Sequence, residues 1–218
     1  MPPSARLLPI LLAASLLAST TALAASLSVT SAKLTAFTKT YGSPVTCTLS
    51  AAADAYVDHA NQSTNYGSAV TLAVASATTA ERRTFVRFEL ANCSPAIPAT
   101  AIVQSATLQL TTAMAAAATR TYELRRAQAS WNEVSIRWVN QPGAGSVTAS
   151  TAVVSGTSSG TVISWSAISD VQSFITGAAT NNGWRLSDSA EGSGSATLNF
   201  NSREAASGHP QLVITYVS

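Results

Sequence analysis

Most of the chain consists of short runs in which apolar and polar residues alternate, separated by residues that favour turns. In residues 83–90, Val86, Phe88 and Leu90 share one side of an extended strand, so a period of two turns them inward and leaves the charges outside. Runs of this kind predict strands at 53–58, 69–76, 83–90, 102–112, 121–127, 146–154, 161–168, 183–189, 196–202 and 211–217. Short strands joined by turns are typical of an antiparallel two-sheet β-sandwich, so the expected fold class is all-β.

One segment, residues 168–177, has apolar residues spaced three and four apart, which predicts a short helix. Ser169 is its expected N-cap, and Gly177 is expected to end it. No internal repeat is visible along the sequence. Residues 53–218 are therefore expected to form a single β-sandwich domain.

The N-terminal residues have the pattern of a secretion signal. Arg6 precedes an apolar run at 7–18, and 22–24 form a small-x-small cleavage sequence. We therefore predict that residues 1–24 are a cleaved signal peptide of a secreted, extracellular protein; the alternative is an N-terminal anchor. Residues 25–52 are rich in Ser and Thr and are expected to be a linker or a first strand.

The composition argues against two classes of partner. Charged residues make up only 10% of the chain, whereas about 25% is usual. No run of Lys or Arg is present to follow a phosphate backbone, so we expect no nucleic-acid partner. After residue 24 no apolar stretch is long enough to cross a bilayer, so we expect no membrane partner either.

The chain contains two cysteines, Cys47 and Cys93. In a secreted protein an isolated pair most simply forms one disulfide, and we predict that bond. The alternatives are two free thiols or a pair of metal ligands. Zinc is disfavoured because the chain has only two histidines.

Catalytic patterns are weak. His59 and His209 both lie in turn-like segments, and no H-x-x-x-H or G-x-S-x-G motif occurs. Glu81, Glu133 and Glu204 are isolated in the sequence, whereas glycan hydrolysis uses two carboxylates at a fixed separation. We assign no catalytic residue, and a polysaccharide lyase or hydrolase is the least favoured of the functions considered.

Several segments taken together resemble a known family. They are ADAYVDHANQSTNYGS, RRTFVRFEL, IVQSATLQL, SWNEVSIRWVNQPGAG and FNSREAASGHPQLVITY, in this order along residues 53–216. This series resembles the DNRLRE-type domain, also called carbohydrate-binding module family 96. The resemblance implies a secreted β-sandwich of jelly-roll type whose ligands include alginate and related acidic polysaccharides.

The motif that contains Arg203 and Glu204 has two interpretations. The alternation places Asn199, Asn201 and Arg203 on the side of a strand opposite the apolar residues. There Arg203 could hold a uronate with two parallel hydrogen bonds, beside amides that bind sugar hydroxyls. Alternatively Arg203 pairs within the protein as a structural brace. The second interpretation is favoured because the motif belongs to the signature of the family that the chain resembles.

Arginines also gather elsewhere. Arg82, Arg83 and Arg87 lie on one predicted strand, and Arg125 and Arg126 on another. If the two strands are neighbours, these arginines form a positive surface for an anionic chain. The alternative is a solvated rim without a ligand.

Aromatic side chains are candidates because sugar rings stack on them. Trp184 follows a predicted turn and Tyr66 lies within one, so both are expected to be exposed ligand contacts, although Tyr66 could instead fasten its own loop. Trp131 and Trp138 are expected on the core side of a strand, and Trp165 also in the core.

Asp54 and Asp58 lie four apart on one predicted strand, and Asn61 follows. Oxygen ligands of this type suit a structural Ca²⁺ ion. The alternative is an ordinary strand end and a turn whose side chains bond to backbone amides.

These observations favour a secreted, non-catalytic module that binds a polysaccharide, with an anionic glycan as the expected partner. The alternative is a structural or adhesive protein of the matrix or cell surface, for which self-association is expected.

Overall fold

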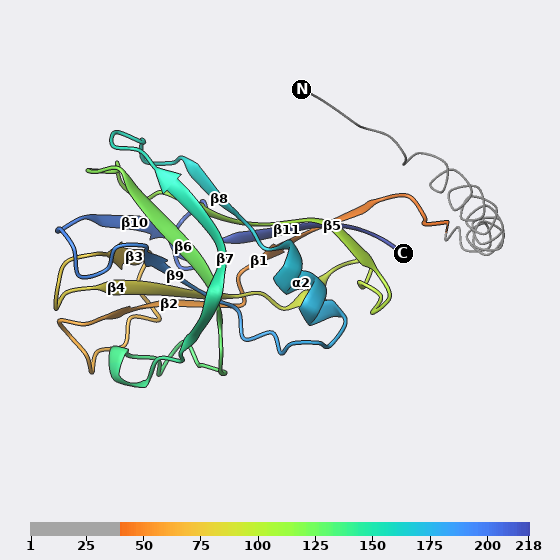
Figure 1. Ribbon diagram of the computed structural model, residues 1–218, viewed down its shortest axis with the longest axis horizontal. Helices are drawn as coiled ribbons and strands as arrows, with labels where there is room; N and C mark the ends of the chain where they lie inside the picture. The colour runs from red at the N-terminus through yellow and green to blue at the C-terminus, as the bar shows by residue number, and fades with distance from the viewer. Residues whose placement is uncertain (1–39) are drawn as a thin grey trace, which may run out of the picture. The chain divides into compact units, whose positions relative to one another are not determined.

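The computed structural model describes residues 40–218, and the fold is that of Gly42–Ser218 (Figure 1). The predicted signal peptide, residues 1–24, lies outside the described residues, as does most of the segment 25–52. Within the described part, no helix is long and apolar enough to cross a membrane.

The smaller of two antiparallel sheets joins the beginning and the end of the fold. In order, its strands are β1 (Val45–Ser50), β11 (Gln211–Val217), β5 (Ile102–Thr111) and β8 (Val162–Ser166). The first of these strands lies inside the segment that we expected to be a linker or a first strand. The alternation expected of a strand is present in β5, where Ala106, Leu108 and Leu110 are buried between polar neighbours.

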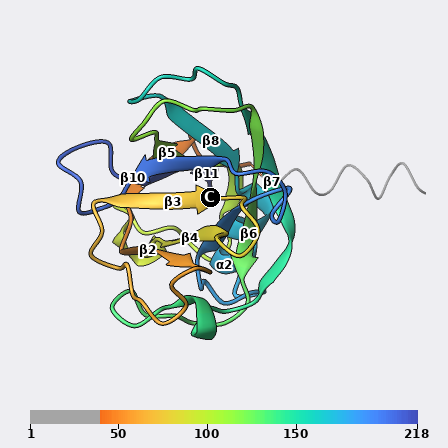
Figure 2. The same ribbon diagram turned by 90° about the vertical axis from the view of Figure 1, so that its left-hand side faces the viewer.

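The larger sheet contains the strands that carry most of the arginines. Its order is β10 (Thr197–Asn201), β3 (Thr71–Ala75), β4 (Arg82–Arg87), β9 (Trp184–Asp188), β6 (Arg120–Ala127) and β7 (Ala144–Val153), and β2 (Ala53–Asp58) also pairs with β4. Figure 2 shows β10, β3, β4 and β2 following one another below β8 and β5. The predicted two-sheet β-sandwich is confirmed.

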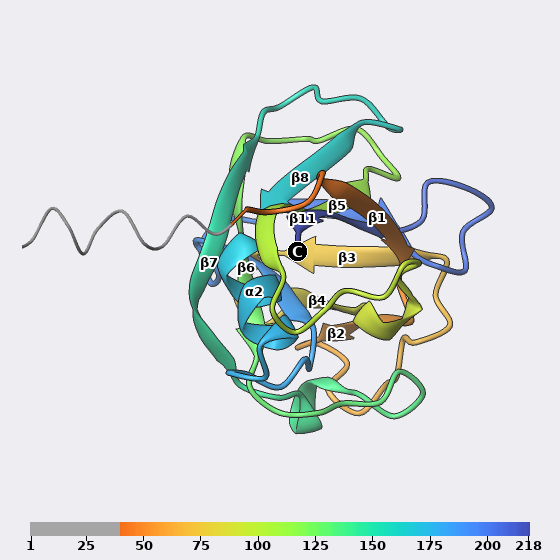
Figure 3. The ribbon, with the colours of Figure 1, turned by 90° about the vertical axis from the view of Figure 1, so that its right-hand side faces the viewer.

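The main core fills the space between the two sheets. Trp165, Trp184, Phe88 and Phe200 are fully buried there, together with alternate residues of most strands. Helix α2 (Ile168–Ile175) lies at one end of the sandwich and packs on β5 (Figure 3). The position of this helix is as predicted.

The start of α2 differs from the prediction. Its N-cap is Ala167 and not Ser169, and no side chain caps the helix. Asp170 fastens the first turn instead, because its carboxylate accepts hydrogen bonds from Thr148 Oγ1 (2.6 Å) and Trp184 Nε1 (2.9 Å). Gly177 does follow the helix, with the positive φ of 73° that glycine tolerates best.

A second, smaller core covers the outer side of β4, where the sequence predicted exposed charges. Phe85 is fully buried there beside Ala55 of β2, under Trp131 and Ile136. The covering residues belong to the connection between β6 and β7, residues 128–143. That connection was predicted to contain a strand, but it consists of turns and one 3-10 segment, Trp138–Asn140.

The predicted disulfide between Cys47 and Cys93 is present. It joins β1 to the segment after the 3-10 turn Leu90–Asn92. The bond closes a loop with a sequence separation of 46, which in the chain-entropy model stabilises the fold by roughly 4 kcal/mol.

Candidate functional site

Three arginines lie together on the outer face of the larger sheet. Strand β9 separates β4 from β6, and its Arg185 is the register partner of Phe85 on one side and of Arg125 on the other. Arg83 lies two residues before Phe85, so it projects from the same side of β4. We call Arg83, Arg125 and Arg185 the arginine face.

Two members of the arginine face have carboxylate partners. Arg83 donates to both oxygens of Glu191, at 2.8 and 2.7 Å, and to Oε1 of Gln141 at 3.2 Å. Arg125 Nη2 lies 2.7 Å from Glu123 Oε2, in an ion pair between alternate residues of β6. These contacts fix both guanidinium groups before any ligand arrives.

Arg185 is different. Within residues 40–218, Arg185 and Arg137 are the arginines that form no ion pair, and Arg137 is exposed on a turn. Arg185 is half-buried, and its Nε is buried without a hydrogen-bond partner. Burial, and then the charge of Arg83, lower the pKa of Arg185 to about 10, so it stays a cation at neutral pH.

An aromatic ring borders the arginine face. The guanidinium carbon of Arg83 lies 4.4 Å from the ring centroid of Trp138. The Trp138 ring also stacks with the His59 ring, with 4.6 Å between the ring centroids and 5° between the ring planes. His59 is in turn held by Glu81, so the half-buried Trp138 side chain is fixed in place.

Two polar pockets lie beyond the arginine face, along the edge formed by residues 126–145. The first, of about 360 Å³, is lined by Arg126, Ala127, Gln128, Gly145, Ala179, Thr180 and Asn182. The second, of about 340 Å³, is lined by Ser130, Trp131, Asn132, Ser135, Ile136 and Asn140. Arg125 donates to the Gly145 carbonyl, so the first pocket adjoins the arginine face. Amides and hydroxyls of this kind match the hydroxyls of a sugar.

The other predicted arginines of β4 are engaged locally. Arg82 Nε lies 3.0 Å from Asp58 Oδ2, and Arg87 Nε lies 3.3 Å from Glu89 Oε1. Arg126, which we grouped with Arg125, projects from the opposite side of β6 and pairs with Asp170 at 3.3 Å. The proposed positive surface therefore contains only part of the predicted set.

The two aromatic candidates behave differently from the prediction. Trp184 was expected to be exposed, but it is fully buried in the main core and donates to Asp170. Its place on β9, two residues from the buried Leu186, explains this. Tyr66 is half-buried and stacks on Tyr56 at 4.2 Å between ring centroids, which fastens its loop.

Arg203 lies just beyond the end of β10 and not on the strand face that carries Asn199 and Asn201. Its backbone N–H donates to Asp54 Oδ2 (2.8 Å), and its Nη1 donates to the Ala52 carbonyl (3.1 Å) and to Glu133 Oε2 (2.9 Å). These bonds join three separate segments, as a brace does.

The two asparagines form none of the hydrogen bonds of this brace. Asn201 Nδ2 donates to the Ser207 carbonyl at 3.0 Å, so it holds the turn after β10. Asn199 Oδ1 is buried and has no hydrogen-bond partner among the described residues.

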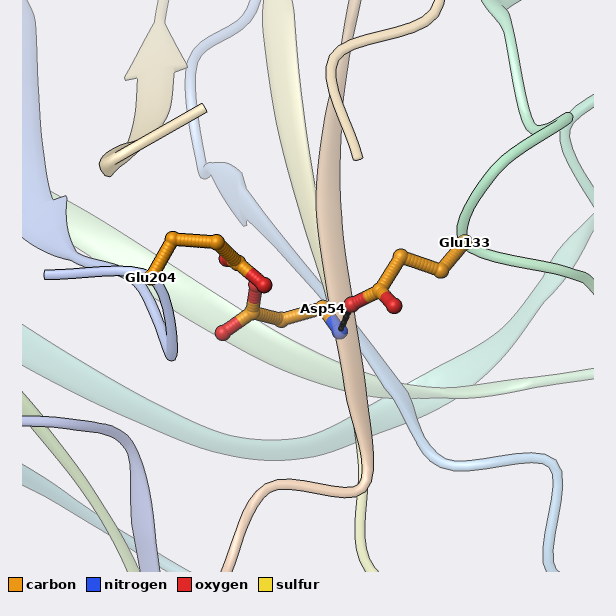
Figure 4. A group of neighbouring side chains, drawn as sticks. All are labelled: Asp54, Glu133 and Glu204. Carbon is orange, nitrogen blue, oxygen red and sulfur yellow. Dashed lines mark hydrogen bonds between the residues drawn. The ribbon is translucent and has the colours of Figure 1, made fainter. Parts of the chain in front are cut away.

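Asp54, Glu133 and Glu204 converge next to Arg203, and we call them the acidic cluster (Figure 4). One carboxylate oxygen of each lies within 4.8 Å of the other two. Burial raises the pKa of Asp54 to about 7, a change that the charges of Glu204 and Glu133 reinforce and the hydrogen bond from the Arg203 backbone opposes.

The metal set predicted from the sequence is not brought together. Asp58 bonds to Arg82, Asn61 and the Ala60 amide. Asp54 and Asp58 stand four residues apart on β2, which is roughly 13 Å along a strand and too far to share one ion. Asp54 belongs instead to the acidic cluster.

Two important residues, Arg185 and Glu133, were missed by sequence reasoning. Arg185 was detectable from the alternation of Trp184 and Leu186, which turns it outward. Glu133 gave no such signal, because it lies in a long connection without periodicity.

A family model described as carbohydrate-binding module family 96 matches residues 45–216. The match covers both sheets, the arginine face and the acidic cluster. No curated protein matches the chain.

Proposed function

This chain belongs to carbohydrate-binding module family 96, and from this we propose that it binds an acidic polysaccharide through the arginine face. The family supports a carbohydrate partner, and the charge of the site supports an anionic one. A uronate carries one carboxylate on each sugar ring, so a guanidinium group can bind it with two parallel hydrogen bonds.

The observation that carries the proposal is that Arg185 has no ion-pair partner. It is half-buried on the outer face of the larger sheet, and neither neighbouring glutamate pairs with it. A cation that is partly removed from water and lacks a counter-ion is costly, and a bound carboxylate would remove that cost. Because Arg83 and Arg125 are already fixed by their own partners, little side-chain ordering is needed on binding.

The first polar pocket extends the binding surface beyond the arginine face. Trp138 contributes to the face by packing on Arg83 while it stacks with His59, which helps to hold Arg83 in place. The pocket that adjoins Gly145 offers amide and hydroxyl groups to further sugar units. An extended polymer that contacts the arginine face and this pocket would gain affinity from several weak contacts on a preformed surface.

We also infer that the protein acts outside the cell. The bond between Cys47 and Cys93 is of a kind that persists in oxidising compartments, and the sequence of residues 1–24 has the pattern of a secretion signal. Mass spectrometry of the protein recovered from culture medium tests this, with Ala25 expected at the mature N-terminus.

Affinity electrophoresis tests the proposed ligand. The protein is run through gels that contain alginate or polygalacturonate, and through gels that contain a neutral glucan or galactomannan. We expect retardation in the acidic gels. Arg185→Met should lower the affinity for them at least about tenfold, since a hydrogen bond to a charged group contributes roughly 1.5–3 kcal/mol.

Arg137→Met is the matched control, because Arg137 also lacks an ion-pair partner but is exposed and is not one of the three arginines of the arginine face. Its retardation should equal that of the wild type. Equal retardation in acidic and neutral gels, or an unchanged affinity of Arg185→Met, would overturn the proposal.

A further inference from the structure

We propose that the acidic cluster binds a divalent cation, with Asp54, Glu133 and Glu204 as ligands and Ca²⁺ as the best-matched ion. This site is separate from the arginine face and does not rest on the proposed polysaccharide function. It also differs from the set of Asp54, Asp58 and Asn61 that the sequence suggested, since only Asp54 is common to both.

The ligand groups come from three segments of the chain. Asp54 lies on β2, Glu133 lies in the connection between β6 and β7, and Glu204 lies in the turn after β10. In Figure 4 the carboxylates of Glu204 and Glu133 point toward Asp54 from opposite sides. Their oxygens, all within 4.8 Å of one another, are spaced closely enough for a small shift to bring them round one ion.

The second observation is that Asp54 is buried with an unpaired carboxylate oxygen. The residue is 1% exposed, and its Oδ1 is buried without a hydrogen-bond partner. Its Oδ2 accepts from the Arg203 backbone, so this oxygen is satisfied. An unpaired carboxylate oxygen in a buried position is costly, and a cation is a partner that removes the cost completely.

The charges of the surrounding groups fit a divalent ion. The acidic cluster carries three carboxylates, and Arg203 is the basic group that pairs with it, through Glu133 and Glu204. The ionised cluster with Arg203 therefore has a net charge of −2. Hydrogen-bonded carboxylate oxygens keep a further lone pair, so Glu133 can remain bonded to Arg203 and the Asp54 amide and still bind a metal.

The choice of Ca²⁺ follows from the ligands and their setting. All three are hard oxygen donors, which Ca²⁺ and Mg²⁺ prefer over softer metals. Glu204 is on an exposed turn, so water can supply additional ligands. The ligands come from two irregular segments and one strand, an arrangement that suits the flexible coordination of Ca²⁺ better than the strict octahedron of Mg²⁺.

A bound ion would fasten the two long connections to the sheet. Glu133 precedes Ile136 and Trp138, which cover the outer side of β4, and Glu204 belongs to the turn that leads into β11. The measurable consequence is stability, because a ligand that binds only the folded state raises the melting temperature.

Thermal unfolding with EDTA or with added CaCl₂, together with calorimetric titration by CaCl₂, tests the proposal. At a Ca²⁺ concentration a hundred times the Kd, we expect the melting temperature of the wild type to rise by about 5–10 °C. Mg²⁺ should give a smaller rise. Glu204→Gln should lose the rise and the titration heat, while its melting temperature in EDTA stays at or above that of the wild type because a repulsive charge is removed.

Asp54→Asn is the second variant, since it keeps the shape of the side chain and removes its charge. Glu89→Gln is the control, because Glu89 is an exposed glutamate that pairs with Arg87 outside the acidic cluster. We expect it to respond to Ca²⁺ as the wild type does.

No rise in melting temperature and no titration heat for the wild type would overturn the proposal and indicate that Asp54 and Glu204 share a proton instead. An equal Ca²⁺ response in Glu204→Gln and the wild type would place the ion elsewhere and also overturn it.

Discussion

The arginine face and the acidic cluster each hold an ionisable group without a counter-charge, which is half-buried at Arg185 and fully buried at Asp54. In the arginine face, two arginines have glutamate partners and Arg185 has none. In the acidic cluster, Arg203 pairs with Glu133 and Glu204, and Asp54 is left with an unsatisfied oxygen. With Glu191 and Glu123 the arginine face keeps a net charge of +1, and the ionised acidic cluster with Arg203 keeps a net charge of −2.

The contrast shows that the number of charges in a region says little about its role. Each region contains two ion pairs, and paired groups of this kind contribute little by themselves when they are partly exposed. What distinguishes each region is the group left without a partner, a cation in one and a carboxylate in the other. We expect the two regions to bind ligands of opposite charge for this reason.

The largest expected effect concerns Asp54 in the absence of divalent ions. Burial raises the pKa of Asp54 in the folded protein to about 7, from 3.8, and Glu204 and Glu133 add to the rise while Arg203 opposes it. Between these pH values the folded state holds a proton that the unfolded state has released. Stability is therefore lost as the pH rises from about 4 to about 8, by roughly 4 kcal/mol.

Urea unfolding in EDTA at a series of pH values measures this loss. Asp54→Asn removes the titrating group, so the free energy of unfolding of the variant should lack the wild type's decline. Identical pH profiles for the two proteins would mean that Asp54 ionises normally and that the acidic cluster is not short of a counter-charge.

The next effect comes from reversing the charge at Arg185. Arg185→Glu places a carboxylate between Arg83 and Arg125 and supplies the missing counter-charge. We expect the affinity for an acidic polysaccharide to fall by about 30-fold or more. The melting temperature should not fall, because a half-buried unpaired cation is removed. A variant that unfolds more easily than the wild type would show that Arg185 is already satisfied.

A smaller effect is expected from Arg203→Ala. The change removes the bonds from Nη1 to Ala52 and Glu133. Because this side chain is 39% exposed, its ion pairs are screened, and we expect the free energy of unfolding to fall by about 1–2 kcal/mol. Calorimetry measures the loss, and polysaccharide affinity should stay within about twofold. Lost binding with unchanged stability would identify Arg203 as a ligand clamp.

The smallest effect is the salt dependence of binding. The affinity for an acidic polysaccharide should fall about threefold between 50 and 300 mM NaCl, since exposed charges are screened over about 10 Å or less. The response of the acidic cluster to Ca²⁺ should be less sensitive, because Asp54 is buried. Polysaccharide affinity that is constant with salt would point to the neutral pockets as the binding region.

The strands and the helix were predictable because each leaves a local period in the sequence. Which strands lie side by side could not be predicted, because alternation shows the side of the sheet on which a residue lies and not which strand is its neighbour. Alternation could have placed the Arg185 side chain outward, but its neighbours on the arginine face follow only from the position of β9 between β4 and β6. Turn residues also led to a wrong prediction. Gly183 suggested that Trp184 would be exposed, but Trp184 is buried in the core.

The acidic cluster was the least predictable part. Asp54 and Glu133 are 79 residues apart, and Arg203 is 149 residues from Asp54. Only the fold brings them together. The connection that carries Glu133 consists of turns and one 3-10 segment where a strand was predicted, so the sequence pattern did not give the direction of this side chain.

The central claim is that an acidic polysaccharide binds to the arginine face. Its most direct test is to map the ligand on the folded protein by NMR. Amide and arginine side-chain signals of the ¹⁵N-labelled protein are followed during titration with an acidic oligosaccharide of defined length. We predict that the largest shifts fall on β9 and β6, at Arg185 and Arg125, with the acidic cluster unaffected. Shifts confined to the smaller sheet, or none at saturating ligand, would contradict the account.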